Sequence, residues 1–149
     1  MSNTKYGKYV LVEPLGKSKH PREIQVPVIR MGMEDQGPIE GWDGLPFSMT
    51  LEAIYSPIEL GGPHGHTHDD VEILMFMGGN PMDYREFGAE AYILLGEERE
   101  KHIINTTTFI YVPGGLRHCP LVFTRVDVPV VFGYIMLAPT YKINLLKED

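Results

Sequence analysis

The chain has 149 residues, of which 43% are apolar and 22% are charged, and 20 acidic residues against 13 basic ones give a formal net charge of −7. This length suffices for one domain with its own hydrophobic core, and the apolar fraction excludes a disordered chain. The acidic balance argues against a nucleic-acid partner, since the longest basic stretch, residues 17–22, is short and interrupted by Pro21.

Cysteine content and hydropathy indicate the cellular compartment to expect for the protein. Cys119 is the single cysteine, so no internal disulfide forms and nothing points to an oxidising compartment. The first residues are polar, without the apolar core of a signal peptide, and no apolar run approaches the roughly 20 residues of a membrane helix. We therefore expect a cytoplasmic protein with no membrane partner.

Short strands joined by turns are the predicted elements, because 16 glycines and 12 prolines are spread along the whole chain. Helical signals are weak and are limited to single turns at residues 83–87 and 143–147, and residues 17–44 look irregular. This pattern predicts an all-β sandwich or barrel. In chain order, the predicted strands cover residues 9–13, 48–55, 71–77, 89–95, 101–104, 106–112, 119–124 and 130–137.

A histidine-rich segment precedes the third of these strands. His66 and His68 lie two residues apart, so in an extended segment both imidazoles share a face and reach one point. Glu72 follows in an otherwise apolar strand, where a lone carboxylate is costly unless it is paired or bound to a cation. A metal ion is the most economical explanation.

A second segment delivers another imidazole. The strand that ends at Pro113 runs into a Pro-Gly-Gly turn, and His118 stands at the start of the next strand. Together with His66, His68 and Glu72 it makes three imidazoles and one carboxylate, a set suited to Fe, Mn, Ni, Cu, Zn or Co. The sequence therefore predicts one divalent transition metal of undetermined identity.

In these two segments the sequence resembles the cupin superfamily. The first cupin motif is a glycine-led His-x-His followed by Glu and Gly, and the second centres on Pro-x-Gly-x2-His. The matching residues are His66, His68, Glu72 and Gly79 in the first motif and Pro113, Gly115 and His118 in the second. The resemblance implies a small double-stranded β-helix, a jelly-roll barrel of the all-β class with little helix, that binds the metal within its mouth.

The match has departures and one alternative register. Thr107 and Val122 stand where the second motif has Gly and Asn, and the long segment 80–106 between the motifs is expected to form a hairpin or lid. A second reading takes His64 and His66 with Asp70 as the ligands, but only the first register also places Gly79. His64 then becomes a candidate proton carrier beside the ligands.

Two function classes remain open at this point. The first is a metalloenzyme that acts on a small, oxygen-rich organic molecule, by dioxygenase-type chemistry or as a Lewis-acid isomerase, lyase or decarboxylase. In it, His64, or Glu72 if displaced from the metal, transfers protons. The alternative is a metal-containing barrel that binds a small molecule without turning it over. A cavity with a polar group beside the open metal positions would favour catalysis.

Other residues receive plainer interpretations. Cys119 is expected to be a buried thiol that points away from the face of His118, and His20 and His102 are expected on the surface. Arg117 and Arg125 are candidates to neutralise a carboxylate substrate. The candidate phenols near a substrate are Tyr55, Tyr111 and Tyr134.

The domain organisation is expected to be a single cupin domain spanning residues 1–149. Residues 1–45 form an N-terminal arm with extra strands, 46–140 the barrel core and 141–149 a C-terminal tail. The arm is long for a minimal barrel, and exposed strand edges invite pairing. We therefore expect a homodimer in which the arm contacts the partner barrel.

Overall fold

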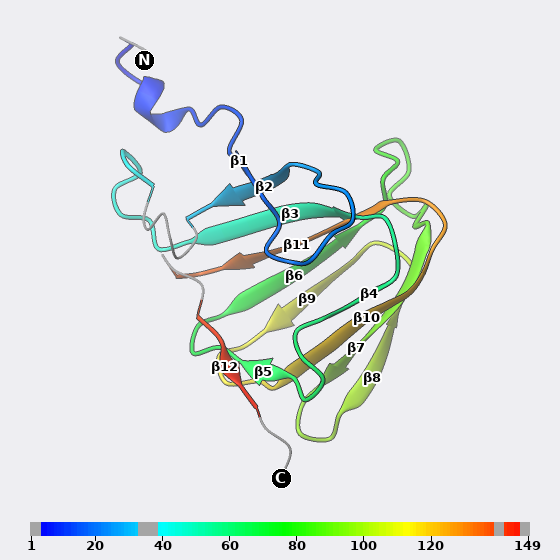
Figure 1. The fold of residues 1–149 in the computed structure, drawn as a ribbon. Coiled ribbons are helices and arrows are strands. Elements are labelled where there is room, and N and C mark those ends of the chain that lie inside the picture. Colours follow the sequence, from blue (N-terminus) through cyan, green and yellow to red (C-terminus); the bar gives the residue numbers. More distant parts are fainter. Residues whose placement is uncertain (1–3, 33–38, 139–141, 147–149) are drawn as a thin grey trace.

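The computed structural model describes residues 4–32, 39–138 and 142–146. Two antiparallel sheets curve around a common interior (Figure 1). One has the strand order β1-β2-β3-β11-β6-β9, and the other has the order β12-β5-β10-β7-β8 with β4 paired to β10. The all-β prediction is confirmed.

The strands of the described residues are β1 (Leu15–Gly16), β2 (Val28–Met31), β3 (Ser48–Ile54), β4 (Ile58–Leu60), β5 (His66–Thr67), β6 (Glu72–Met77), β7 (Ala89–Leu95), β8 (Glu100–Ile104), β9 (Thr108–Val112), β10 (His118–Val126), β11 (Val130–Met136) and β12 (Asn144–Leu145). Seven of them, β3 and β6 to β11, match the predicted ranges to within a few residues. The other five were not predicted, and β2 lies in the stretch 17–44 that was expected to be irregular. Strands β7 and β8 form the expected hairpin between the two histidine motifs.

Three local predictions are wrong. Residues 9–13 form no strand: the 3-10 turn η1 (Gly7–Tyr9) overlaps them, and Val10, Leu11 and Val12 are exposed without a neighbouring strand to pair with. Residues 83–87 form turns instead of a helix. At the C-terminus β12 pairs with β5 where a helical turn was expected, because the chain passes beside an open strand edge; residue 147 lies outside the described residues.

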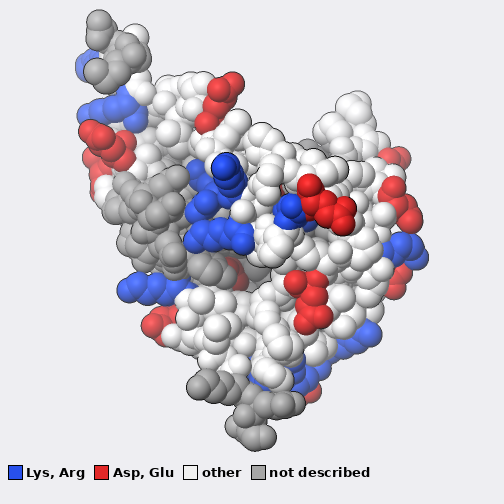
Figure 2. All heavy atoms as spheres, in the orientation of Figure 1, with Lys and Arg blue, Asp and Glu red and all other residues white. Residues whose placement is uncertain are grey.

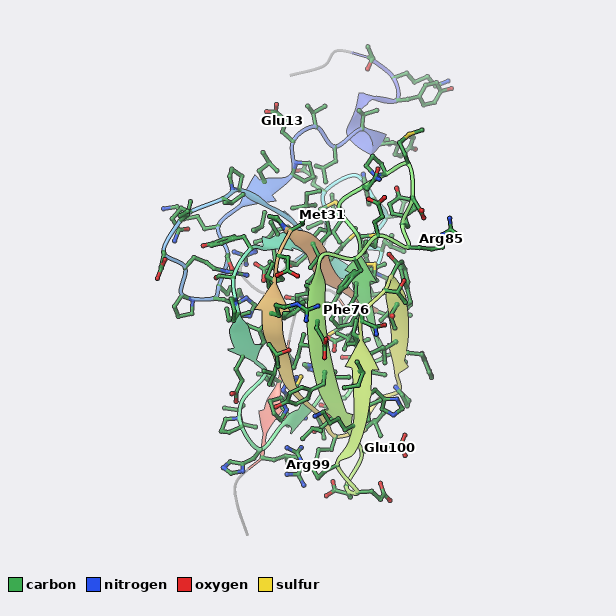
Figure 3. All side chains as sticks on the ribbon, turned by 90° about the vertical axis from the view of Figure 1, so that its right-hand side faces the viewer. Glu13, Met31, Phe76, Arg85, Arg99 and Glu100 are labelled. Carbon is green, nitrogen blue, oxygen red and sulfur yellow. The ribbon has the colours of Figure 1, made fainter. Side chains whose placement is uncertain are left out.

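The core lies between the sheets. Phe76 of β6 is fully buried, and its ring centroid lies 5.2 Å from Phe132 of β11 and 6.2 Å from Phe123 of β10. Figure 3 shows Phe76 midway along the barrel. This aromatic cluster closes the interior at that level, so any ligand space must lie nearer an end of the barrel.

Strand β3 turns its polar side chains to the interior. Ser48, Thr50 and Glu52 are buried together with Ile54, whereas the alternate apolar residues lie on the outer face. A buried polar row is costly unless each group finds a partner. Its presence marks this part of the interior as a lined cavity and not as packed core.

The N-terminal region contributes to the first sheet. Strands β1 and β2 extend it beyond β3, and the loop between them crosses its concave face (Figure 1). Parts of the expected arm and tail, residues 1–3, 33–38, 139–141 and 147–149, lie outside the described residues. Within the part of the chain that is described, no helix has the length and hydrophobicity needed to cross a bilayer.

Candidate metal centre

Three imidazoles converge at one end of the barrel. His66, His68 and His118 each offer a ring nitrogen, and these atoms lie within 4.8 Å of one another. All three side chains are buried. Cross-strand pairing accounts for the convergence, because His66 of β5 stands directly opposite His118 of β10.

Backbone carbonyls fix the orientation of each ring. The Nδ1 atoms of His66 and His118 donate to Gly61 O at 2.8 Å and to Leu116 O at 2.9 Å, and His68 Nδ1 donates to Lys142 O. A carbonyl only accepts, so each Nδ1 carries the proton when the ring is neutral. Each Nε2 then presents a lone pair toward the centre of the cluster, as a metal ligand does.

The Nε2 atoms themselves make a poor set of hydrogen-bond partners. His66 Nε2 lies 3.2 Å from His68 Nε2, and two lone pairs at that distance repel each other. His118 Nε2 is buried and has no partner with hydrogen-bond geometry. A proton or a cation between these nitrogen atoms would relieve the repulsion, and the residues fit a metal ion.

Glu72, the first residue of β6, lies beside two of the three imidazoles. Its Oε1 lies 3.2 Å from His118 Nε2 and 3.5 Å from His68 Nε2, and its side chain is almost fully buried. The group whose ligand atoms all lie within 4.8 Å of one another consists of the three histidines, and the carboxylate lies beside two of them. A cluster of three imidazoles suits a divalent transition metal, and Glu72 as a fourth ligand stays a prediction.

Electrostatics favour the ligand forms of Glu72 and His66, whereas in the absence of a metal they favour a protonated His68. Burial would raise the pKa of Glu72, but its interactions with His118 and His68 lower it to about 2. Burial lowers the pKa of His66 to about 4. Burial would likewise lower the pKa of His68, but contact with Glu72 raises it instead. An ionised carboxylate beside a neutral imidazole is what a metal requires of them.

Glycine turns hold the two motifs together. Gly115 N donates to His68 O at 2.7 Å, which ties the Pro-Gly-Gly turn to the histidine segment. Gly65 has φ +76°, and a Cβ there would lie 2.7 Å from the carbonyl oxygens of His118 and Cys119. Only a residue without a side chain permits β5 and β10 to approach this closely.

The overall architecture is similar to that of a solved cupin structure. A cupin-2 domain protein from Rhodospirillum rubrum matches 90% of this chain and 75% of its own length, with a TM-score of 0.55 at 14% sequence identity. The chain has the cupin fold. A scan of protein-family models and a search of curated proteins both find no match.

Two further solved structures resemble this cupin fold more loosely. An oxalate oxidase matches 80% of this chain with a TM-score of 0.49 at 16% identity, and the chain spans about half of that protein, 54% of its length. A cupin 2 conserved barrel domain protein from Salinispora arenicola matches 73% of this chain and 72% of its own, with a TM-score of 0.47 at 17% identity.

A cavity of about 60 Å³ opens beside the ligands in this cupin barrel, and we call it the metal-centre cavity. Its walls are partly apolar, from Leu60, Leu74, Leu121 and Phe132, and partly polar. The polar side chains that line it, apart from the ligands, are His20 and Tyr134. Of the three candidate phenols, Tyr134 is the one at the site; burial raises its pKa to about 12, so it keeps its proton.

His20, which was expected on the surface, is 33% exposed and also contacts the interior. Its Nδ1 donates to Glu52 Oε1 at 2.8 Å, and its ring lines the metal-centre cavity. Ser18 also donates to Glu52, at 2.7 Å, and Arg22 forms an ion pair with it at 3.2 Å. These contacts join residues that are 30 to 34 positions apart, so local sequence patterns could not show them. His102 is exposed, as predicted.

His64 precedes the candidate ligands in the chain, but it does not line the metal-centre cavity. Its carbonyl oxygen accepts hydrogen bonds from Arg117 Nη2 at 2.7 Å and from Arg99 Nη1 at 3.3 Å. Arg99 comes from the β7–β8 hairpin tip at the lower end of Figure 3. Arg117 thus anchors the loop that carries His64. Arg125 forms an ion pair with Asp127 at 3.0 Å. Neither Arg117 nor Arg125 lines the metal-centre cavity.

Cys119 is buried, as expected, but its predicted direction is wrong. The side chain lines the same cavity as His118. Strand alternation fails here because Cys119 has φ +78° and the pairing of β10 with β7 shifts register between His118 and Leu121. Burial raises the pKa of Cys119 to about 12, so the thiol stays protonated and is a poor metal ligand.

Proposed function

We propose that this chain is a metal-dependent enzyme that acts on a small, oxygen-rich organic molecule. His66, His68, Glu72 and His118 hold one divalent transition metal in this proposal. The observation that carries it is the convergence of three Nε2 lone pairs on one point, with every Nδ1 tied to a backbone carbonyl. A structural histidine cluster has no need of that orientation.

The metal, when bound, supplies either oxygen chemistry, with Fe, Ni or Cu, or Lewis-acid chemistry for isomerisation, lyase or decarboxylation reactions, with Mn, Zn or Co. The chain supplies the surroundings. Leu60, Leu74 and Phe132 limit water around the substrate, which strengthens electrostatic contacts there. Tyr134 lines the same cavity, keeps its proton and shares a hydrogen bond with Thr50.

Proton transfer falls to an imidazole in this proposal. His20 lines the metal-centre cavity, and Glu52 holds its Nδ1, so a neutral ring turns an Nε2 lone pair away from Glu52. A carboxylate that orients a histidine is a recurring arrangement in general acid–base catalysis. The role of His64 as proton carrier stays a prediction, with His20 now the imidazole that shares a cavity with the ligands.

The first test is the metal content of the untagged protein, prepared without chelator and measured by mass spectrometry. Wild type is expected to carry about one equivalent, and His118→Ala is expected to lose it by at least about tenfold, because one of four ligands is removed. His102→Ala is the matched control, since His102 is an exposed imidazole on the same barrel. It should keep the metal.

The identity of the metal directs the search for a reaction. Iron, copper or nickel leads to oxygen-uptake assays, and manganese, zinc or cobalt leads to anaerobic isomerase, lyase and decarboxylase screens. Equal, substoichiometric metal in wild type, His118→Ala and His102→Ala would refute the four-ligand site and the enzyme with it.

A binding protein is the second candidate, because four apolar side chains line the metal-centre cavity. The two candidates differ in what His20 does. In an enzyme, His20→Gln lowers turnover of the identified substrate while the metal content is unchanged. In a binding barrel the metal-loaded protein binds its ligand without converting it.

A further inference from the structure

The two chain segments that carry the candidate ligands are joined by little regular structure. We call residues 61–66 and 116–119 the ligand segments. Strands β5 and β10 share one register pair, His66 with His118, and β5 is only two residues long. A ladder of one pair is too short to fix two segments by itself. Contacts outside the ladder therefore have to set the distance between the histidines.

The tip of the β7–β8 hairpin, residues 96–99, lies against the second ligand segment. Gly96 N donates to Arg117 O at 2.7 Å, and Glu97 Oε2 forms an ion pair with Arg117 Nη1 at 3.1 Å. The tip belongs to neither histidine motif and carries none of the candidate ligands. Its contacts act on the segments that hold the ligands.

Arg99 joins this hairpin tip to both ligand segments. Its Nη1 donates to Cys119 O at 2.8 Å and to His64 O at 3.3 Å, and its Nη2 donates to Pro63 O at 3.2 Å. One of these carbonyls belongs to the residue directly after a candidate ligand, and the other two lie two and three residues before another. The planar guanidinium has several donors in a rigid fork, so one side chain bridges both backbones.

The local backbone is shaped around this guanidinium. Arg99 has φ +56°, in the left-handed region, where a residue with a side chain carries strain of about 1 kcal/mol that glycine would avoid. An arginine at this position therefore adds its side-chain contacts at the expense of strain in the turn. Gly65 leaves room for it, since a Cβ there would lie 3.0 Å from Arg99 Nη1.

Arg117 makes a second connection between the ligand segments. It precedes His118 in the chain, and its Nε and Nη2 donate to His64 O at 2.9 Å and 2.7 Å. Two guanidinium groups thus meet at one carbonyl oxygen. The hairpin tip supplies one of them, Arg99, and Glu97 of the same tip pairs with the other.

We infer that Arg99 is a positioning residue of the metal centre, which fixes the two ligand segments relative to each other before a metal binds. This inference rests on the proposed function, since it concerns the same site. Without Arg99 the barrel still folds, but the spacing of His66 and His118 is less well defined. Metal binding is then weaker, and the ligand geometry around the metal changes.

The first test uses Co²⁺ as the probe on the full-length protein. Competition with a chromophoric chelator measures its affinity, and its visible spectrum reports the geometry of its ligands. Arg99→Met should weaken Co²⁺ binding at least about tenfold and alter the spectrum, as the loss of a contact that orients ligands does. Arg99→Lys keeps the charge without the fork and should recover only part of the affinity.

The removal of one positive charge needs its own control, because Lys and Arg side chains are spread over the face that Figure 2 shows. Arg85→Met provides this control. Arg85 is exposed and lies at the opposite end of the barrel from Arg99, as Figure 3 shows. Its replacement should leave both the Co²⁺ affinity and the spectrum unchanged.

Hydrogen–deuterium exchange of the metal-free protein tests the same role without any metal. In Arg99→Met, amides of the ligand segments should exchange at least about tenfold faster than in wild type. Strand β3 is the internal reference, because it lies in the other sheet and is paired on both sides, with β2 and β11. Its exchange should be unchanged, which separates local loosening from general destabilisation.

The outcomes separate this role from the metal site itself. If Co²⁺ binds Arg99→Met as tightly as wild type, the metal site stands and the positioning role fails. Full affinity in Arg99→Lys would also overturn the role, because charge alone would then suffice, and so would equally faster exchange in β3. If wild type binds no Co²⁺, the metal site fails and the exchange rates of the ligand segments alone decide the role of Arg99.

Discussion

Glu52 is the residue that fastens the loop between β1 and β2 to the barrel. It is 5% exposed and accepts hydrogen bonds from Ser18 and His20, and it pairs with Arg22. Burial alone would raise the pKa of Glu52, but these contacts lower it below its ordinary value. A carboxylate with a lowered pKa stabilises the fold above its unfolded pKa, and that contribution is lost as pH falls through the folded pKa.

Replacing Glu52 by Gln should therefore remove a pH-dependent part of the stability. At pH 7 we expect Glu52→Gln to lower the free energy of unfolding by about 2–3 kcal/mol, because the buried Arg22 loses its counter-charge. Urea unfolding followed from pH 7 down to pH 3 measures it. The difference between wild type and variant should shrink as Glu52 becomes protonated in the wild type.

An exposed carboxylate provides the comparison. Glu59→Gln in β4 alters an exposed side chain and should change the free energy of unfolding by less than about 0.5 kcal/mol at every pH. A Glu52→Gln difference that stays constant from pH 7 to pH 3 would show that Glu52 acts through its shape and not through its charge.

The candidate ligands could be read from the sequence, and their surroundings could not. His66 and His68 share a face by strand alternation, and His118 follows a turn of recognisable composition. Local sequence patterns are therefore sufficient to identify all three. His20 reaches the site through long-range packing of the β1–β2 loop onto β3. No periodicity within the loop encodes that contact, and His20 therefore looked like a surface residue.

At the scale of elements, the pairing of β5 with β10 sets the geometry of the metal centre. The single register pair between them joins His66 to His118, and Gly65 precedes it with φ +76°. A Cβ at residue 65 would lie 2.7 Å from the carbonyl oxygens of His118 and Cys119, which are backbone atoms and cannot yield cheaply. The two strands would have to separate.

Gly65→Ala should therefore weaken metal binding at least about tenfold, because ligands must be held within a fraction of an ångström. Competition with a chromophoric chelator measures the affinity. Gly44→Ala is the matched control, since Gly44 also has positive φ, +68°, but a Cβ there meets nothing within 4 Å. It carries the backbone strain of about 1 kcal/mol without the clash. Equal metal affinity in the two variants would exclude the strand-spacing argument.

The sequence predicted the bounds of a strand well where buried and less buried residues alternate regularly, as in β7. The prediction was wrong where the register of a strand is broken. In β10 the positive φ of Cys119 turns its side chain to the same cavity as His118. A strand reading assumes extended geometry at every residue, so it assigned the thiol to the opposite face. The bulge that changes this depends on tertiary packing around Gly61 and Gly65.

At the scale of the whole molecule, the outer face of the first sheet is apolar. Two of its aromatic side chains, Phe109 and Tyr111 of β9, are 57% and 64% exposed. An antiparallel sheet with one face on the core normally turns polar residues outward, and a contiguous apolar face marks an interaction surface. By alternation with the buried rows, this face includes Met49, Leu51, Ala53, Ile73, Met77, Val131 and Ile135.

We propose that a second copy of the chain covers this face in a homodimer. A two-fold symmetric pair matches an apolar face to itself, which needs no other partner. The N-terminal segment projects from the barrel (Figure 1) and offers further exposed apolar side chains, Tyr6, Val10 and Val12, that extend the contact in this proposal. Light scattering of wild type should give about twice the mass of one chain.

The double variant Phe109→Lys and Tyr111→Lys should be monomeric, because like charges would meet across the two-fold axis without partners. Its circular dichroism should match wild type, since neither side chain packs into the core. Lys101→Glu with Lys142→Glu, which changes charge on exposed residues elsewhere, should leave the dimer intact.

A variant lacking residues 1–12 separates the two surfaces: an unchanged dimer assigns the interface to the sheet alone, whereas a monomer assigns it to the arm. A wild-type monomer at all concentrations would contradict the proposal and leave the apolar face to a different partner.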